Sequence, residues 1–468
     1  MQWRATPPAV FLLLTLFTAF SSVLAAAALP EALEVWPQEV VLTLPKAGGQ
    51  EFAVSYTSHP MKVIVDSNQP LSGFPASALV GDVALRELRY SEDASGPSRL
   101  VLEFNYQLPP GSVQEDGDYF RLVVPKTFVD TTTRIVEPGV VYGHQRRADS
   151  FGPNVVNYLE IDLQRNWEVK LVLAQDRIYG AERVSDMAKR TGAIAAVNGA
   201  YFASNGRPLG VFMIDGELIT EPYANRTAVG LTPQGAVMDN VSFAGEVRHE
   251  GRLLAPVSGL NRPRLQDELI VYTEAYGTKT NTNRWGHEVV VVDGVVVAVQ
   301  PEGNSTIPPG GFVLSAHGVM RQHLAELEPG DRVELKISLM PDWSELGVRQ
   351  IIGGGPRLVR SGVLEITGEA EQFKDDILKG RAPRTAIGIT ADHRLLLVTV
   401  NGRQPNVSVG MTLEELGNLL IELGALEAMN LDGGGSTTMV VRNLVLNLPS
   451  DGKERAVANA IVVVPGSK

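Results

Sequence analysis

Two triple-glycine segments bring together the residue types best suited to chemistry in this sequence. One is Gly353–Gly355, which follows an apolar run, and the other is Gly433–Gly435, which follows Asp432. Glycine at the end of a strand can take positive φ and lets the backbone approach a ligand closely. In the second segment a carboxylate, backbone N–H groups and the hydroxyl of Ser436 come together within a few residues. We therefore expect the second segment to bind a sugar phosphate. For both segments the alternative is a tight turn without a ligand.

The second segment is not a Walker A loop. That motif needs the pattern G-x-x-x-x-G-K-[ST] at the start of a helix. Residues 437–441 instead have the pattern of another strand. The candidate phosphate site is therefore of a different kind.

Two arginines precede a predicted strand at 385–390. Arg381 and Arg384 stand in the run RAPRTAIGI, where a guanidinium can hold a phosphate through two parallel hydrogen bonds. A solvated surface arginine is the alternative. A weaker copy of the pattern, NRTAVGL, contains Arg226.

Asn198 follows a predicted buried strand at 194–197 and precedes the aromatic residue Tyr201. It is either a turn asparagine or a hydrogen-bonding group for a sugar hydroxyl. The histidines show no H-E-x-x-H spacing, and only His317, which precedes a glycine between apolar segments, is a candidate for a functional role. The spacing assigns no metal ligands, and we expect no cofactor.

The elements that position these residues are strands and two clear helices. One helix is predicted over 184–191, and a second begins at Thr412, where Thr412-x-x-Glu415 is a capping box before a leucine-rich face. We expect the runs 155–163 and 167–174 to pair with each other, and further strands over 289–299, 333–339, 385–390 and 395–400. The pattern lacks a regular βαβ alternation. It predicts the α+β class, with a mixed-sheet catalytic domain and flanking helices over 140–466.

The first 135 residues have a different organisation. An apolar run from Ala9 to Leu24 followed by small residues predicts a secretory signal over 1–28, although the run is also long enough to stay as a membrane anchor. Residues 30–135 contain short alternating runs that predict a small all-β accessory domain. We therefore expect a secreted or cell-envelope protein that touches a membrane only through its N-terminal segment, if that segment is uncleaved.

Composition excludes several classes of partner and site. The net charge is -12 and no long basic run occurs, which argues against a nucleic acid or an anionic lipid surface as the partner. The chain has 0 cysteines, so disulfides, thiolate zinc sites and thiol nucleophiles are excluded.

Five segments in order resemble the phosphodiester glycosidase family: AVNGAYF at 196–202, IGGGP at 352–356, RTAIG at 384–388, NGR at 401–403 and NLDGGGS at 430–436. Each is a weak signal alone, and their order makes the resemblance specific over about residues 145–465. Enzymes of this family hydrolyse the bond between the anomeric carbon of a sugar and a phosphodiester. The resemblance therefore implies an exported hydrolase that acts on N-acetylglucosamine 1-phosphodiesters, with a carbohydrate phosphodiester or a cell-wall polymer as its partner.

The resemblance also implies the site residues. It implies catalytic roles for Asp432, Asn198 and Arg384. The residues implied in substrate binding are Gly353, Gly354, Gly355, Gly433, Gly434, Gly435, Ser436, Arg403 and Tyr201.

The chemistry agrees with these roles. Cleavage develops oxocarbenium character at the sugar, while the leaving phosphate is a weak base, so neutralising charge matters more than a strong general acid. One carboxylate must still activate water or attack directly, and we expect Asp432 to do so. Candidates for a second carboxylate are Asp215, Glu274 and Glu288.

Two other functions stay open. A non-catalytic envelope protein would bind polysaccharide without turnover, and a phosphodiesterase would break the P–O bond on the far side of the phosphorus. Isotope-labelled water distinguishes the glycosidase from the phosphodiesterase.

Overall fold

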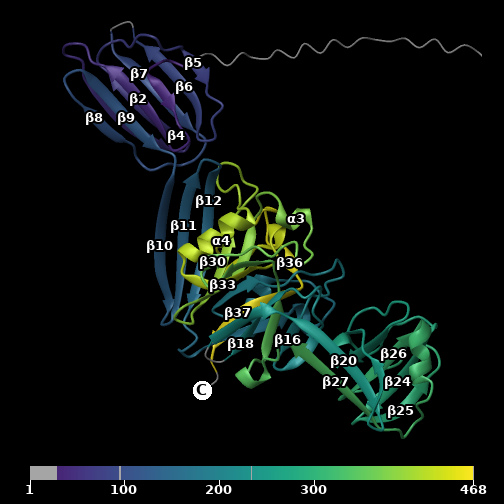
Figure 1. Cartoon of the computed structure of the whole chain (residues 1–468). Coiled ribbons are helices and arrows are strands. Elements are labelled where there is room, and N and C mark those ends of the chain that lie inside the picture. Colours follow the sequence, from purple (N-terminus) through teal and green to yellow (C-terminus); the bar gives the residue numbers. More distant parts are fainter. Residues whose placement is uncertain (1–28, 94–95, 233–234, 467–468) are drawn as a thin grey trace, which may run out of the picture. The chain divides into compact units, whose positions relative to one another are not determined.

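The computed structural model describes residues 29–93, 96–232 and 235–466. The predicted signal over 1–28 lies outside these residues. The chain divides into two compact units, one containing Val40–Val124 and the other continuing from Pro125 (Figure 1). Within the described ranges, no helix has the length and apolarity needed to cross a membrane.

The first unit contains two antiparallel sheets. The four-stranded sheet has the order β1 (Leu33–Val35), β2 (Glu39–Pro45), β9 (Tyr119–Pro125) and β8 (Ser112–Glu115), and the five-stranded sheet has the order β3 (Phe52–Ser58), β4 (Met61–Ser67), β7 (Ser98–Phe104), β6 (Leu85–Glu92) and β5 (Ser77–Leu79). In β4, Met61, Val63 and Val65 are buried and alternate with partly exposed residues, because successive side chains of a strand point to opposite faces.

The second unit is built on two large antiparallel sheets. The eight-stranded sheet has the order β10 (Phe128–Glu137), β11 (Val140–Asp149), β12 (Gly152–Ile161), β32 (Leu395–Val400), β31 (Arg384–Thr390), β33 (Ala425–Asn430), β29 (Arg357–Arg360) and β30 (Val363–Leu364). A five-stranded sheet has the order β13 (Trp167–Leu173), β37 (Asn459–Pro465), β15 (Ala195–Asn198), β34 (Met439–Val441) and β35 (Leu444–Val445).

The main hydrophobic core lies between these two sheets. It combines Leu159 and Ile387 of the eight-stranded sheet with Val197 and Ile461 of the five-stranded sheet. Helix α4 (Leu413–Glu422) packs on the other face of the eight-stranded sheet, and α1 (Val184–Thr191) packs on the other face of the five-stranded sheet. The second unit thus has a central pair of sheets with one helix outside each.

Three further sheets and a strand pair complete the second unit. The strand pair is β14 (Glu182–Arg183) with β36 (Ala456–Val457), and a three-stranded sheet has the order β21 (Arg252–Pro256), β20 (Ser242–His249) and β27 (Val333–Met340). One five-stranded sheet has the order β17 (Glu217–Thr220), β16 (Phe212–Ile214), β28 (Gln350–Gly353), β18 (Thr227–Thr232) and β19 (Gly235–Asn240). The other has the order β22 (Gly259–Leu260), β23 (Leu269–Thr273), β26 (Gly311–His317), β24 (Gly286–Val292) and β25 (Val295–Gln300). We call residues 242–340 the inserted lobe. Its first and last strands, β20 and β27, pair from Ser242 opposite Met340 to His249 opposite Val333.

The predicted helices form as expected. Helix α1 ends at Gly192, which has φ 68°, and α4 begins after Thr412, whose side chain accepts a hydrogen bond from the Glu415 N–H as part of a complete capping box. The two remaining α-helices within the described ranges, α2 (Arg321–Leu324) and α3 (Asp375–Leu378), are single turns.

The structure corrects two predictions about the sheets. The fold is predominantly β rather than α+β. The eight-stranded sheet is antiparallel throughout, and the mixed sheet is the one in the inserted lobe, where β22 and β23 pair in parallel. The runs at 155–163 and 167–174 do not pair with each other, because β12 joins β11 and β32 whereas β13 crosses to the other sheet and pairs with β37. Residues 162–166 therefore form a connection between sheets.

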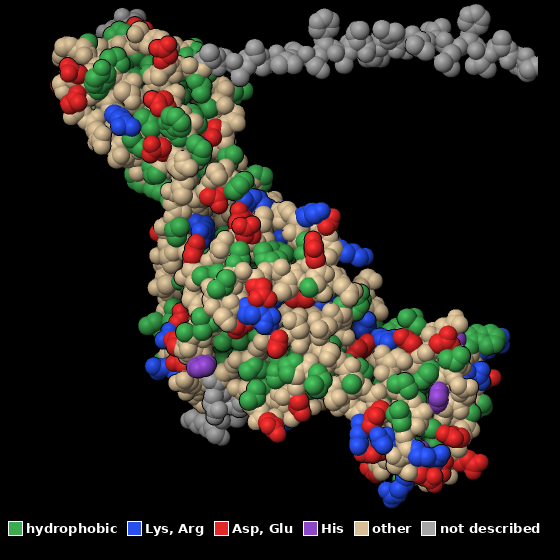
Figure 2. Space-filling model, in the orientation of Figure 1, with side chains coloured by type: hydrophobic (Ala, Val, Ile, Leu, Met, Phe, Trp, Pro, Cys, Tyr) green, Lys and Arg blue, Asp and Glu red, His purple; other side chains and the backbone are tan. Residues whose placement is uncertain are grey.

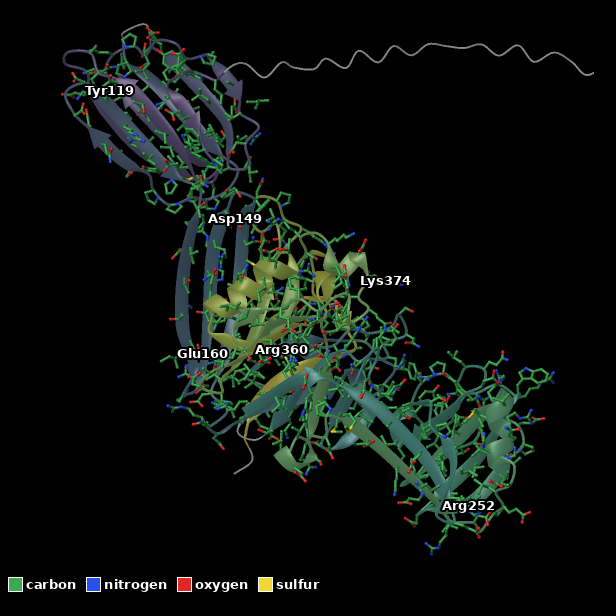
Figure 3. The ribbon with its side chains drawn as sticks, in the orientation of Figure 1. Tyr119, Asp149, Glu160, Arg252, Arg360 and Lys374 are labelled. Atoms are coloured by element: carbon green, nitrogen blue, oxygen red, sulfur yellow. The ribbon has the colours of Figure 1, made fainter. Side chains whose placement is uncertain are left out.

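Charged side chains of both signs are interspersed over the face of the second unit shown in Figure 2. Some form pairs across strands. Glu160 on β12, labelled in Figure 3, forms an ion pair with Arg394, which precedes the neighbouring strand β32.

Candidate functional site

Asp432 lies where the chain passes from one large sheet to the other. Strand β33 of the eight-stranded sheet ends at Asn430, and β34 of the five-stranded sheet begins at Met439. The intervening segment contains Asp432 and the glycines, with a single 3-10 turn at Gly434–Ser436. The carboxylate is therefore positioned by two sheets rather than by one.

The end of β15 fixes the backbone of Asp432 from both sides. The Asn198 side-chain amide donates to the Asp432 carbonyl at 2.7 Å, and the Asp432 N–H donates to the Gly199 carbonyl at 3.1 Å. Asn198 Oδ1 accepts hydrogen bonds from the Thr385 hydroxyl at 2.8 Å and the Thr438 N–H at 3.0 Å. Asn198 is buried, and in the structure its side chain holds the backbone of Asp432, whereas its predicted role in catalysis stays a prediction.

The Asp432 carboxylate is partly buried and has an altered acidity. Burial raises its pKa to about 6, although hydrogen bonds from the Ser436 side chain and the Gly433 N–H and the nearby charge of Arg455 act in the opposite direction. A carboxyl group with this pKa is mostly ionised at neutral pH and is a better proton acceptor than an exposed aspartate. The environment therefore suits a general base.

Two arginines approach the glycine turn after Asp432. A Cβ added to Gly434, which has φ 62°, would lie 3.2 Å from Nη2 of Arg403, and one added to Gly435 would lie 2.0 Å from Nη2 of Arg455. The Arg403 side chain is exposed, and Arg455 pairs with Asp451 at 2.7 Å. Arg403 was predicted as a substrate-binding residue, whereas Arg455 and Asp451 were missed because they lie outside every motif.

Of the backbone N–H groups of Gly433, Gly434 and Gly435, which were expected to contact a phosphate, two already donate within the chain. The Gly433 N–H donates to the Asp432 carboxylate at 3.0 Å, and the Gly434 N–H donates to the Pro383 carbonyl at 2.9 Å. Among the residues that the structure describes, the Gly435 N–H has no acceptor. One free N–H and two guanidinium groups thus surround the turn.

Tyr201 lies beside the end of β33 and near Asp432. Its hydroxyl donates to the Gly355 carbonyl at 3.0 Å and accepts from the Asn430 side-chain amide at 2.6 Å. Burial raises the pKa of Tyr201, and the Asp432 carboxylate raises it further. Within the described part of the chain, the buried atoms Asn430 Oδ1 and Thr438 Oγ1 have no hydrogen-bond partner, so both are available to a hydroxyl or a water.

Arg384 is placed differently from the prediction of a direct phosphate clamp. Its guanidinium is buried and donates to the carbonyls of Met411 at 2.9 Å, Gly380 at 3.2 Å and Ile377 at 3.3 Å. Burial lowers its pKa, and the nearby Tyr201 hydroxyl acts in the opposite direction. The positive charge of Arg384 therefore lies behind Tyr201, with most of its donors used by backbone.

The other arginine of that motif contributes to a helix. Arg381 forms an ion pair with Glu415, the capping-box residue of α4, and its guanidinium lies 4.2 Å from the centre of the Phe151 ring. Arg381 is thus held by the fold, and it is neither positioned at Asp432 nor a freely solvated surface group.

Arg226, the arginine in the weaker copy of the motif, lies close to Tyr201. Its guanidinium is 3.7 Å from the ring centre of Phe373 and 4.8 Å from that of the exposed Tyr223, and the Phe373 and Tyr201 rings are 5.6 Å apart. Burial lowers the pKa of Arg226, whereas Tyr201 and Tyr223 raise it. An aromatic and cationic surface thus extends from Tyr201.

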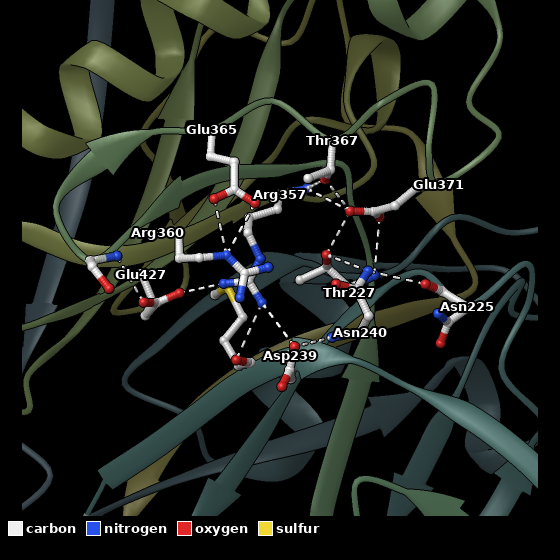
Figure 4. A network of polar contacts seen from close by, with 12 residues as sticks. Asn225, Thr227, Asp239, Asn240, Arg357, Arg360, Glu365, Thr367, Glu371 and Glu427 are labelled. Atoms are coloured by element: carbon white, nitrogen blue, oxygen red, sulfur yellow. Dashed lines mark hydrogen bonds and ion pairs between the residues drawn. The ribbon is translucent and has the colours of Figure 1, made fainter.

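The segment that carries Phe373 is held by the network drawn in Figure 4. Glu371 accepts hydrogen bonds from the Thr227 N–H at 3.0 Å, the Thr227 hydroxyl at 2.6 Å, the Arg357 N–H at 3.1 Å and the Thr367 hydroxyl. Arg357 is fully buried and pairs with Glu427 of β33. These contacts fix the loop to β18 and to the sheet that carries Asp432.

The first triple glycine has a packing role. The N–H groups of Gly353, Gly354 and Gly355 donate to the carbonyls of Val211, Thr227 and Asn430 at 2.7, 3.0 and 2.8 Å. A Cβ on Gly355, which has φ 99°, would lie 2.2 Å from Glu371 Oε2. The glycines are required by close packing, and their connection to the site is the Gly355 carbonyl that holds Tyr201.

The structure places the three candidate second carboxylates elsewhere. Asp215 lies in the β16–β17 turn, where it accepts from Gln350 at 2.9 Å and lines a cavity of about 450 Å³. Glu274 and Glu288 lie in the inserted lobe, and the fully buried Glu288 accepts from the Ser315 hydroxyl at 2.6 Å. His317 is in the same lobe. Among the described residues, no group of three or more His, Cys, Asp or Glu side chains has a metal-binding arrangement.

Comparisons with known proteins agree with the resemblance found in the sequence. A family model described as phosphodiester glycosidase matches residues 286–464. The SPbeta prophage-derived uncharacterized protein YomE of Bacillus subtilis (strain 168) is 38% identical over 86 residues, which is 18% of this chain and 13% of that protein. The N-acetylglucosamine-1-phosphodiester alpha-N-acetylglucosaminidase of Bos taurus is 30% identical over 115 residues, which is 22% of this chain and 21% of that enzyme. The matches therefore span about a fifth or less of these relatives.

Two solved structures share the fold. A hypothetical protein from Synechocystis has a TM-score of 0.65 at 23% identity and covers 91% of this chain and 77% of its own. A putative exported protein from Burkholderia pseudomallei K96243 has a TM-score of 0.59 at 22% identity and covers 90% of this chain and 98% of its own. The match of the family model includes Asp432, Arg384, Arg403 and both triple glycines, so these residues lie in the part of the chain that is similar to phosphodiester glycosidases.

Proposed function

We propose that this protein is an exported glycosidase that hydrolyses the bond between a sugar anomeric carbon and a phosphodiester, with N-acetylglucosamine 1-phosphodiesters of cell-envelope glycans as substrates. The observation that carries the proposal is the position of Asp432. Its carboxylate, with a pKa of about 6, accepts from the first N–H of a glycine turn flanked by Arg403 and Arg455, and it lies near Tyr201, which bonds Asn430.

In the proposed reaction Asp432 accepts a proton from water as the water oxygen attacks the anomeric carbon. The bond between that carbon and the phosphate oxygen breaks, and the phosphate leaves as a phosphomonoester. The leaving oxygen is weakly basic, so a strong general acid is not needed. In the alternative route Asp432 attacks the anomeric carbon directly as the phosphate leaves, and a single water molecule then hydrolyses the glycosyl ester so formed.

Arg403, Arg455 and the Gly435 N–H are the proposed phosphate ligands. Charge-assisted hydrogen bonds from guanidinium groups are the stronger kind, and donors already in place stabilise developing charge most effectively. Asn198 holds the Asp432 backbone, while Tyr201 and the unpaired Asn430 Oδ1 face the proposed sugar side. Arg384 contributes a buried positive charge behind Tyr201.

Hydrolysis in ¹⁸O-labelled water tests the proposal. A small N-acetylglucosamine 1-phosphodiester is incubated with the chain, and the phosphate product is analysed by mass spectrometry. Unlabelled phosphomonoester is expected, because the water oxygen goes to the sugar. Label in the phosphate would show cleavage of the P–O bond and would overturn the glycosidase assignment.

Binding without turnover is the remaining alternative. If cell-wall polymer binds to the chain while neither the polymer nor the small phosphodiester is hydrolysed, the chain is a polysaccharide-binding protein. The Asp432→Asn variant is the matched control, because its loss of turnover assigns the observed hydrolysis to this site.

A further inference from the structure

Strand β10 is an open edge of the eight-stranded sheet. It occupies one end of the strand order, with β11 as its neighbour (Figure 1). Residues 129–135 are all exposed, and the side chains of Val129 and Ile135 are 57% and 78% exposed. The ladder with β11 is regular until a bulge between Ile135 and Glu137, so the edge is straight over most of its length.

Such an edge presents a row of unpaired backbone groups to solvent. Proteins usually guard it with lysine, proline, a central bulge or covering structure. The run VDTTTRI at 129–135 contains neither lysine nor proline, and the bulge lies beyond it. The edge is therefore open to another strand.

The side chains of β10 are arranged symmetrically about Thr132. When the strand is paired antiparallel with a copy of itself so that Thr132 faces Thr132, Asp130 faces Arg134 and Val129 faces Ile135. Each of these pairs occurs twice because of the two-fold axis, as an isologous interface requires. Opposite charges and apolar pairs at facing positions both stabilise strand pairing.

We propose that β10 is a self-association surface, on which β10 of a second copy of this chain pairs antiparallel in the register that places Thr132 opposite Thr132. Neighbouring registers lack the complementarity. A shift of two residues in either direction places Asp130 opposite Thr132 or Val136, and a shift of one places it opposite Thr133 or Ile135. The symmetric register is the one that pairs both charges.

The charges on β10 are available for this pairing. Among the described residues, neither Asp130 nor Arg134 forms an ion pair within the chain. On the other side of the strand, Arg146 of β11 stands opposite Asp130 and Tyr142 stands opposite Arg134. The second copy would therefore place Asp130 between two arginines and add a carboxylate to Arg134.

The interface is small, because it consists of one pair of short strand segments. Interfaces of this kind give weak, concentration-dependent association. The proposed dimer is therefore expected at high micromolar chain concentrations rather than at nanomolar ones.

Cross-linking tests the register, and the absence of native cysteine makes single-cysteine variants clean probes. Facing residues in an antiparallel pair have Cα atoms about 4.5 or 5.5 Å apart, within the disulfide range. Thr132→Cys should therefore form a covalent dimer on mild oxidation. Val129→Cys should not, because residue 129, although also exposed, lies six residues from its own copy, about 20 Å along the strand. Equal cross-linking of both variants, or of neither, would overturn the register.

Charge reversal tests the surface independently by sedimentation velocity of the full chain. Asp130→Arg and Arg134→Asp each place like charges opposite each other twice, and each should weaken self-association by about tenfold. Mixing the two variants restores opposite charges at both positions, so a mixed dimer should form where neither variant alone associates. Wild-type chain that stays monomeric at high concentration, or variants that associate as strongly alone as when mixed, would refute the proposal.

Discussion

Replacing Asp432 with asparagine should lower activity and raise stability at the same time. Asp432→Asn keeps the shape of the side chain and its hydrogen bond from the Gly433 N–H but removes the charge. Loss of a general base typically reduces the rate by at least about 10²-fold. The stability should increase at neutral pH, because folding buries the Asp432 carboxylate and raises its pKa to about 6 from an ordinary value of 3.8.

The magnitude follows from the two pKa values. A difference of about two units corresponds to about 3 kcal/mol, and solvent screening of the partly exposed side chain reduces this to about 2 kcal/mol. The folded state favours the protonated form of Asp432. The free energy of unfolding of wild-type chain is therefore highest below about pH 4, and this contribution is lost as pH rises through about 6. Asp432→Asn should thus be as stable as wild type at pH 4 and more stable at pH 7.5.

Urea unfolding at the two pH values and initial rates on an N-acetylglucosamine 1-phosphodiester measure both effects. Asp392→Asn is the matched control, because the Thr390 hydroxyl lowers the pKa of that exposed carboxylate, so its removal should never stabilise the fold and should leave the rate unchanged. An Asp432→Asn chain that hydrolyses at the wild-type rate would refute the role of Asp432 as base. One that is less stable than wild type at pH 7.5 would refute the burial argument.

Four other outcomes are expected. The pH dependence of kcat should rise with pH through about 6, as Asp432 ionises, and a flat profile would oppose the assignment. Arg403→Ala should lower kcat/KM about 10- to 100-fold without changing Tm, since the side chain is exposed; equal kinetics would remove it from the phosphate site. Arg384→Lys should lower the free energy of unfolding by about 1–3 kcal/mol, measured in urea, because three carbonyls lose their donors; an unchanged midpoint would contradict this. Thr412→Ala should destabilise the fold by about 1 kcal/mol through the lost cap with unchanged kinetics.

The two longer helices were predicted correctly because the residues that begin or end them lie in the local sequence. The capping box at Thr412 and the glycine at 192 stand next to the helix ends that they determine, so both helices were found within one or two residues. Strand pairing has no such local signal. The partner of β13 is β37, almost 300 residues later, and the adjacent β12 was the natural but wrong choice.

The residues of the candidate site that lie in sequence motifs were predicted, whereas those brought to it only by the fold were not. Asp432 and Asn198 were found because motifs surround them, and the structure joins them through a 2.7 Å hydrogen bond. Arg455 was missed because it lies in an ordinary polar loop, and only the fold brings it to Gly435. The sequence also could not show that Arg384 faces three carbonyls, since those acceptors are provided by Ile377 of α3, by Gly380 and by Met411.

The inserted lobe leaves and rejoins the second unit at neighbouring positions, with Ser242 opposite Met340. Its buried cluster from Val247 to Val333 is made of the lobe's own residues. The ends of the lobe are already adjacent in the folded second unit. Replacing the lobe with a short turn therefore changes the entropy of loop closure only a little. A two-residue hairpin turn in place of residues 243–339 should therefore leave the Asp432 region folded. Hydrogen exchange in the full chain should then show two cooperative sets of amides, with those around Asp432 unaffected when the lobe opens.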